Sequence, residues 1–189
     1  MIKNYDALWF AKAFLEDIPM VFDHNLYSYN NKAVAEFLKL NPAYITAPLE
    51  LNKKELSYRH NTNSELLIYG KLPLMTSAQC VKRSTGGCKK QAGVSYIKDR
   101  YNIMFPIKNN CEECYNVIYN SLPLILFGQA EELKRMHFAS YRLSFTTENA
   151  KETANVLAAC EQTFVMATKN IKDIYSADFT YGHYKRGVE

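Results

Sequence analysis

The first 70 residues alternate between segments with a helical spacing of apolar residues and short apolar runs. Helices are predicted over residues 6–16, 31–40 and 52–60, and strands over residues 20–22, 44–46 and 66–69. Strands that alternate with helices of about ten residues are typical of successive βα units. This part of the chain is therefore expected to form a parallel sheet with helices between its strands.

The pattern changes after residue 71 and changes back after residue 121. In between, strand-like pieces alternate with loops that carry Gly, Lys and Cys, and these pieces cover residues 94–97, 103–107 and 115–119. Beyond them the sequence predicts a helix over residues 130–137, a strand over 141–145 and a long helix over 148–170. The threonines at 146 and 147 are expected to start this long helix.

These patterns divide the chain into four parts. We expect βα units of a partial barrel (1–71), a cysteine-rich insertion with short strands (72–121), final βα units (122–175) and a flexible tail (176–189). A complete barrel of eight βα units needs at least about 200 residues, and this chain has fewer units. The expected fold class is therefore α/β: either the C-terminal half of a TIM-like (β/α) barrel with a cysteine-bearing, β-rich insertion, or a smaller open fold.

Functional side chains of such sheets lie where strands end and loops begin. By this rule His24-Asn25, Pro48-Glu50 and Tyr69-Gly70 are expected at the mouth of the barrel. The candidates for holding a substrate there are His24, Glu50, Tyr69 and Arg142. The alternative is that they are ordinary turn and capping residues. The histidines have no cysteine or serine neighbour that suggests a catalytic triad, and no H-E-x-x-H motif is present. A peptidase mechanism therefore cannot be built from these residues.

Composition and charge are those of an ordinary globular protein. Hydrophobic residues make up 48% of the chain and charged residues 22%, with a formal net charge of +4. No stretch approaches the roughly 20 apolar residues of a membrane-spanning helix, and the amino terminus lacks the features of a secretory signal. We therefore expect a cytoplasmic protein without a membrane partner, whose five cysteines do not form a disulfide framework.

Four of the five cysteines follow the pattern C-x7-C-x22-C-x2-C, at Cys80, Cys88, Cys111 and Cys114. The last pair has the spacing of two ligands in one turn, and Gly86 and Gly87 allow the first pair to fold inwards. Four thiolates suit a 4Fe-4S iron–sulfur cluster or, as the alternative, tetrahedral zinc. The stretched first pair favours the cluster, whose corners lie further apart than the ligands of one ion. A redox dithiol or a site without metal is also compatible with the spacing, and Cys160 is interpreted as a core residue.

Basic residues are concentrated near these cysteines. Lys82, Arg83, Lys89 and Lys90 lie in the loop around Cys88, and tyrosines follow at 96, 101, 115 and 119. Basic and aromatic residues together are typical of proteins that bind the phosphate backbone and unstacked bases of RNA. The alternative is a solvated basic face that offsets the charge of the thiolates.

Several short stretches together resemble the collagenase-like peptidases of family U-32. They are Asp23-His24-Asn25-Leu26-Tyr27, Ala47-Pro48-Leu49-Glu50-Leu51, Tyr69-Gly70 with Pro73-Leu74-Met75, Ser77-Ala78-Gln79-Cys80, Asp99-Arg100 and Cys111-x2-Cys114-Tyr115-Asn116. The resemblance covers nearly the whole chain in order and spacing. It implies a TIM-like barrel whose N-terminal half is missing from this chain, so that the missing half or an oligomer partner is an expected partner.

The resemblance also implies a function, on which the family is divided. Members are described as collagenase-like proteases, whereas others act in hydroxylation of transfer RNA, ribosomal RNA or the ubiquinone ring and bind a 4Fe-4S cluster through four cysteines. Cys80, Cys88, Cys111 and Cys114 match those ligands in number and region. The first expectation is therefore an iron–sulfur protein acting in RNA hydroxylation. The alternatives are a collagenase-like protease and a non-catalytic fragment with a structural zinc site.

Overall fold

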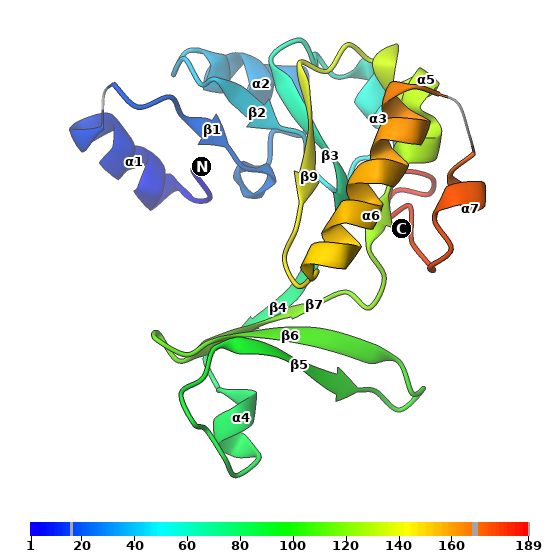
Figure 1. The fold of residues 1–189 in the computed structure, drawn as a ribbon. Helices are drawn as coiled ribbons and strands as arrows, with labels where there is room; N and C mark the ends of the chain where they lie inside the picture. The colour runs from blue at the N-terminus through cyan, green and yellow to red at the C-terminus, as the bar shows by residue number, and fades with distance from the viewer. Residues whose placement is uncertain (16, 168–169, 189) are drawn as a thin grey trace. The chain divides into compact units, whose positions relative to one another are not determined.

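The computed structural model describes residues 1–15, 17–167 and 170–188, and its chain divides into two compact units. The first unit is formed by Met1–Ile68, Leu126–Leu143 and Tyr181–Glu189, and the second by Tyr69–Ile125 and Ser144–Thr180. The chain therefore passes between the units four times. Figure 1 shows the elements of both units, coloured along the chain.

A parallel sheet forms the centre of the first unit. Its strands β1 (Val21–Phe22), β2 (Tyr44–Thr46) and β3 (Ser64–Gly70) are neighbours, with Phe22 opposite Ile45 and Ile45 opposite Ser64. A further strand, β9 (Ser140–Ser144), pairs with β3. The predicted α/β class is thereby confirmed. Among the described residues the strands do not close into a barrel.

Asparagine side chains start the helices of the first unit. The helices α1 (Tyr5–Phe14), α2 (Asn31–Leu38) and α3 (Lys53–Tyr58) follow Asn4, Asn30 and Asn52, each of which accepts a hydrogen bond from a backbone N–H of the first turn. The 3₁₀ turns His24–Leu26 and Phe127–Gln129 and the helix α5 (Ala130–Lys134) also belong to this unit. None of the described helices is long and apolar enough to span a membrane.

One face of α1 is buried and the other carries exposed aromatic rings. Leu8 and Ala11 pack into a core cluster that includes Phe22 and Ile45. Trp9 is 69% exposed and Phe14 is 64% exposed, and the centroids of their rings lie 6.3 Å apart. Residue 16, which the sequence places at the end of this helix, lies outside the described residues.

An antiparallel sheet of four strands belongs to the second unit and is drawn in shades of green in Figure 1. The strands are β4 (Pro73–Ser77), β5 (Gly93–Lys98), β6 (Met104–Asn110) and β7 (Tyr115–Tyr119), in the order β4-β7-β6-β5. A short helix, α4 (Val81–Ser84), follows β4 in the chain. The sheet begins and ends at neighbouring points, because the N–H of Asn120 donates to the carbonyl oxygen of Leu72 over 2.8 Å.

The remaining elements of the second unit lie later in the chain. The strand β8 (Leu124–Ile125) runs antiparallel to the last two residues of β3. The helix α6 (Ala150–Cys160) continues into a π-helical segment, Glu161–Val165, and is followed by α7 (Ile171–Ile174). The predicted helix over 148–170 is thus shorter as an α-helix, and its residues 168 and 169 lie outside the described part of the chain.

The start of α6 differs from the sequence prediction. Asn149 and Glu152 form a capping box, in which each side chain accepts a hydrogen bond from the backbone N–H of the other residue. The N–H groups of Thr146 and Thr147 instead donate to the carboxylate of Glu148 over 2.6 and 3.0 Å. The prediction that these threonines start the helix was therefore wrong, because the asparagine side chain satisfies the first turn.

Candidate functional site

The four clustered cysteines of the second unit lie in two loops. Cys80 follows β4 and Cys88 precedes β5, whereas Cys111 and Cys114 form the turn between β6 and β7. Ser77, the last residue of β4, is the partner of Asn116 in β7. Cys80 and Cys114 are therefore attached to adjacent strands at the same end of the sheet.

The contacts of Cys80 join these loops. The side chains of Cys88 and Asn116 lie close to its thiol. The backbone N–H groups of Arg83 and Lys82 lower the pKa of the Cys80 thiol, and the contacts with Asn116 and Cys88 act in the same direction. Hydrogen bonds to the sulfur stabilise its thiolate form, which is the form that binds metals.

Cys80 and Cys114 also line one cavity of about 260 Å³, together with Gln79, Arg83 and Ser84. Cys114 adopts a φ of 56°, and its sulfur lies 3.8 Å from the carbonyl oxygen of Cys111. Cys111 is thus in the same turn. The structure brings Cys80, Cys88 and Cys114 into one region and leaves Cys111 partly buried beside it.

The donor set of this region fits a metal group that prefers sulfur. Among the described residues, no three His, Cys, Asp or Glu side chains form a preformed group of metal ligands. The exposed loop that carries Cys88 includes Gly86 and Gly87, where an added Cβ would meet no atom within 4 Å. This loop therefore has room to adjust, and four thiolates are the number and type of ligands that tetrahedral zinc or a four-iron cluster requires.

The fifth cysteine, Cys160, lies apart from this set at the end of α6. It is partly buried, and burial raises the pKa of its thiol. A raised pKa disfavours the thiolate form, so Cys160 has the properties of a structural cysteine.

Three of the four predicted mouth residues belong to the first unit. His24 directly follows Asp23 at the end of β1, Glu50 follows β2, and Arg142 lies on β9. Arg142 contacts the carboxylate of Asp23 through Nη2 at 3.4 Å and that of Glu65 through Nη1 at 3.2 Å. The structure therefore connects Arg142 with two acidic residues that were not among the four predicted mouth residues.

Asp23 is the centre of this group. Its side chain is 3% exposed, and its Oδ1 lies 3.2 Å from Nδ1 of His24. Burial raises the pKa of Asp23, but the contact with His24 and the charges of His24 and Arg142 outweigh it and lower the pKa. The Oε2 of Glu50 is buried and has no hydrogen-bond partner among the described residues, and burial together with the charge of Glu50 raises the pKa of Tyr29.

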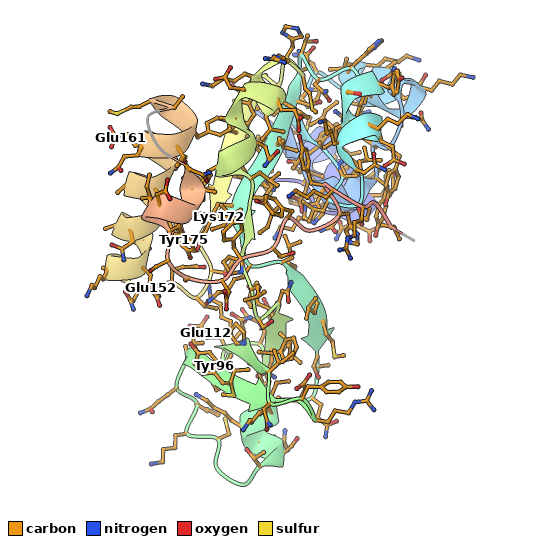
Figure 2. All side chains as sticks on the ribbon, turned by 90° about the vertical axis from the view of Figure 1, so that its right-hand side faces the viewer. Tyr96, Glu112, Glu152, Glu161, Lys172 and Tyr175 are labelled. Carbon is orange, nitrogen blue, oxygen red and sulfur yellow. The ribbon has the colours of Figure 1, made fainter. Side chains whose placement is uncertain are left out.

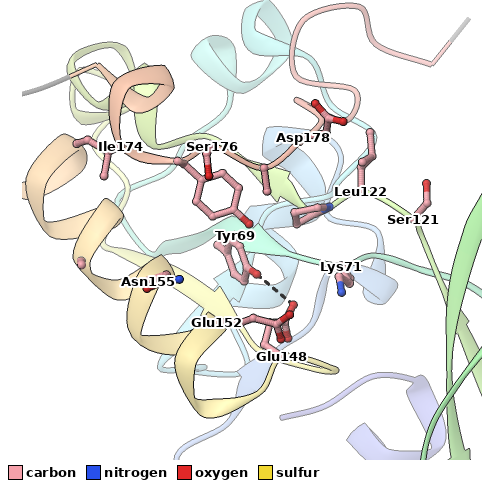
Figure 3. A pocket seen from close by; sticks show the side chains of 14 residues that line it. Tyr69, Lys71, Ser121, Leu122, Glu148, Glu152, Asn155, Ile174, Ser176 and Asp178 are labelled. Atoms are coloured by element: carbon pink, nitrogen blue, oxygen red, sulfur yellow. Dashed lines mark hydrogen bonds between the residues drawn. The ribbon is translucent and has the colours of Figure 1, made fainter.

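Tyr69, the fourth predicted residue, belongs to the second unit and lines a cavity of about 600 Å³. Its hydroxyl donates to Oε1 of Glu148 over 3.1 Å, as Figure 3 shows. Burial and the charge of Glu148 strongly raise the pKa of Tyr69. Glu148, Glu152 and Asp178 also line this cavity, and none of them was predicted as a site residue. The only signal in the sequence is the polar run before α6, which contains Glu148.

The predicted basic residues lie on α4 and the loop after it. Arg83, Lys89 and Lys90 are exposed, and Lys82 is partly buried and donates to the carbonyl oxygen of Gln91 over 3.1 Å. Tyr96 and Lys98 of β5 lie on the same exposed face of the hairpin β5–β6 as Lys108 of β6. Val94, Tyr96 and Lys98 alternate along β5 and therefore share a face, and Lys108 is the partner of Val94. Tyr96, labelled in Figure 2, is 56% exposed.

The described residues thus contain three candidate sites. They are the cysteine region, the Arg142 group of the first unit and the Tyr69 cavity of the second unit. No family model, curated protein or solved structure matches the chain, so its function has to be inferred from these groups of residues.

Proposed function

We propose that this chain is an iron–sulfur protein of the collagenase-like peptidase family U-32 that acts in the hydroxylation of transfer or ribosomal RNA. In this proposal its parallel βα units are the C-terminal half of a TIM-like barrel, and the sheet β4–β7 is an insertion in that barrel. The observation that carries the proposal is that cysteine thiols converge at one end of the adjacent strands β4 and β7.

The ligands of the cluster in this proposal are Cys80, Cys88, Cys111 and Cys114. When bound, a 4Fe-4S cluster supplies one-electron transfer. The N–H groups that point at the sulfur of Cys80 stabilise its thiolate, and Arg83, which lines the same cavity, offsets the negative charge of the thiolates. Residues around a metal that hydrogen-bond its ligands tune both affinity and potential.

The hairpin β5–β6 supports RNA as the substrate. Tyr96 presents an exposed ring between Lys98 on its own strand and Lys108 on the next, and at the tip the Arg100 guanidinium lies 4.7 Å from the centroid of the Tyr101 ring. Stacking of a base on an exposed aromatic ring contributes about 1–3 kcal/mol, and neighbouring lysines bind the phosphates. This face has the features of a binding surface for unpaired nucleotides.

The metal content of anaerobically purified protein tests the cluster. We expect about four irons and four acid-labile sulfides per chain, with broad visible absorption. Serine in place of Cys80, Cys88, Cys111 or Cys114 should lower the iron content sharply, whereas Cys160→Ser, the matched control, should leave it unchanged. One zinc per chain without colour would contradict the cluster and make the cysteine region a structural site.

Nucleoside analysis tests the proposed reaction. In a strain that lacks the full-length gene, mass spectrometry of digested transfer and ribosomal RNA should reveal a nucleoside that has lost one oxygen atom. The gene with Cys160→Ser should restore that oxygen, and the gene with Cys80→Ser should not. An unchanged set of nucleosides after deletion would refute the RNA substrate, even if the cluster is present.

A further inference from the structure

The cavity of about 600 Å³ in the second unit contains none of the cysteines and has no role in the proposed function. Four segments of the chain converge on it. They are the end of β3 with Lys71, the residues 121–123, the first turns of α6 with Glu148 before them, and the residues 174–178 from the last residue of α7 onwards. Small-molecule sites have volumes of about 300–1,000 Å³ and are built in this way from convergent elements.

Hydrogen bonds fix one wall of this cavity. Tyr69 is 1% exposed, and its hydroxyl donates to Oε1 of Glu148. The other oxygen of Glu148 accepts the N–H groups of Thr146 and Thr147, and Nζ of Lys71 donates to Oγ1 of Thr147 over 2.9 Å. The Glu148 carboxylate is thereby held in place by three donors before any ligand arrives.

The charge of the lining is negative. Glu148, Glu152 and Asp178 line the cavity against a single lysine, Lys71, which leaves an excess of two negative charges. Glu152 uses its Oε2 in the cap of α6, and a carboxylate accepts further hydrogen bonds at its second oxygen. An anionic ligand would be repelled by this lining, and a neutral ligand would leave its excess charge uncompensated.

Two aromatic rings complete the lining. Tyr69 and Tyr175 both line the cavity. The face of a tyrosine ring attracts ammonium and guanidinium groups by about 0.5–2 kcal/mol, depending on how far the cation is desolvated. The ring of Tyr175, which is partly exposed, also provides apolar surface for an alkyl chain, whereas Tyr69 is almost fully buried and holds Glu148.

We propose that this cavity is a binding site for a small organic cation, a primary alkylamine or diamine. Glu152 and Asp178, which Figure 3 shows apart from each other, bind its ammonium groups, one each in a diamine, and its alkyl chain packs against Tyr175. The site is independent of the metal, because no cysteine takes part in it.

Titration with 1,5-diaminopentane tests the site, by calorimetry at about 0.15 M salt, where nonspecific surface attraction is largely screened. Pentan-1-ol and pentanoate, with the same carbon chain but no positive charge, should not bind. In the double variant Glu152→Gln, Asp178→Asn the dissociation constant of the diamine should rise at least tenfold. The Glu152→Gln change keeps the capping box, so the fold of α6 is retained.

A matched double variant controls for the change in net charge. Glu161→Gln with Asp173→Asn removes the same charge from exposed positions of the same unit that do not line the cavity. Figure 2 shows Glu161 at the opposite end of the helical segment from Glu152. This control should bind the diamine as the parent does. Equal binding of pentanol, unchanged affinity in the cavity variant, or equal loss in the control would each overturn the proposal.

Discussion

Arg59 shows at the residue scale how a buried charge is held in the first unit. The side chain is 5% exposed and donates to the carbonyl and hydroxyl oxygens of Ser28, to Oδ1 of Asn61 and to Oγ of Ser64, all within 2.9 Å. Burial lowers the pKa of its guanidinium to about 10, which leaves it charged at neutral pH. It thereby connects the loop before α2 with the start of β3.

Replacing Arg59 should destabilise the protein strongly. Arg59→Met should lower the free energy of unfolding by about 2–4 kcal/mol, because several buried oxygens lose their donor. Arg59→Lys should lie between the parent and the methionine variant, since one ammonium cannot reach all these acceptors. Urea unfolding followed by far-ultraviolet circular dichroism measures the effect. The matched substitution Arg100→Met, at an exposed position, should change it by less than about 0.5 kcal/mol.

The sequence predicts single functional residues only where their position follows from the strands. His24 and Glu50 were chosen as candidates because strand ends can be recognised from short apolar runs. The contact of Arg142 with Asp23 joins residues that are 119 positions apart, and no local pattern encodes such a pair. The same holds for Tyr69 and Glu148, which are separated by 79 positions.

At the element scale, apolar patterns located most strands well. The bounds predicted for residues 44–46 and 115–119 are those of β2 and β7. The strand β4 was missed, because Leu74 and Met75 are both exposed and its residues do not alternate between apolar and polar. The α-helical part of α6 ends at Cys160 although apolar residues continue to Met166, because the next five residues, Glu161–Val165, are π-helical.

Gly70 lies very close to the neighbouring strand β9. A Cβ at this position would lie 2.9 Å from the carbonyl oxygen of Ser144 and 3.1 Å from its Cβ. Gly70 ends β3 and Ser144 ends β9. A glycine is therefore needed here because the backbone of the neighbouring strand occupies the space of a side chain.

The variant Gly70→Ala should consequently be less stable. We expect a loss of about 1–3 kcal/mol in the free energy of unfolding, since a backbone atom has to move. Thermal and urea unfolding measure this loss. Gly87→Ala is the control, because a Cβ there meets no atom within 4 Å, and its stability should equal or slightly exceed that of the parent. Equal losses in both variants would show that the contact with Ser144 is unimportant.

At the scale of the whole molecule, each unit is assembled from separate segments of the chain. The first unit takes three segments and the second takes two, and β3 and β9 contribute residues to both. Local patterns predict elements in order along the chain, but they do not encode which distant segments join. The α/β class was therefore predictable, whereas the composition of the two units was not.

The sheet β4–β7 should be removable from this arrangement. Pro73 is the partner of Tyr119 in the β4–β7 pair, so residues 74–118 can be replaced by Asn-Gly, which closes a two-residue hairpin. The variant should fold, lose all bound iron and still bind 1,5-diaminopentane. Circular dichroism, iron analysis and calorimetry measure these properties. A variant that remains unfolded would show that the sheet is needed for the stability of the rest of the chain.

The exposed ring of Trp9 determines how such measurements should be read. It is the chain's single tryptophan, and at 69% exposure it is already in water when the protein is folded. The wavelength of its fluorescence emission should therefore change little on denaturation. It indicates whether the ring on α1 is in contact with water, and does not indicate whether the core of either unit is folded. Intrinsic fluorescence would register anything that covers α1 as a blue shift, which gives this protein a built-in optical reporter for contacts at that helix.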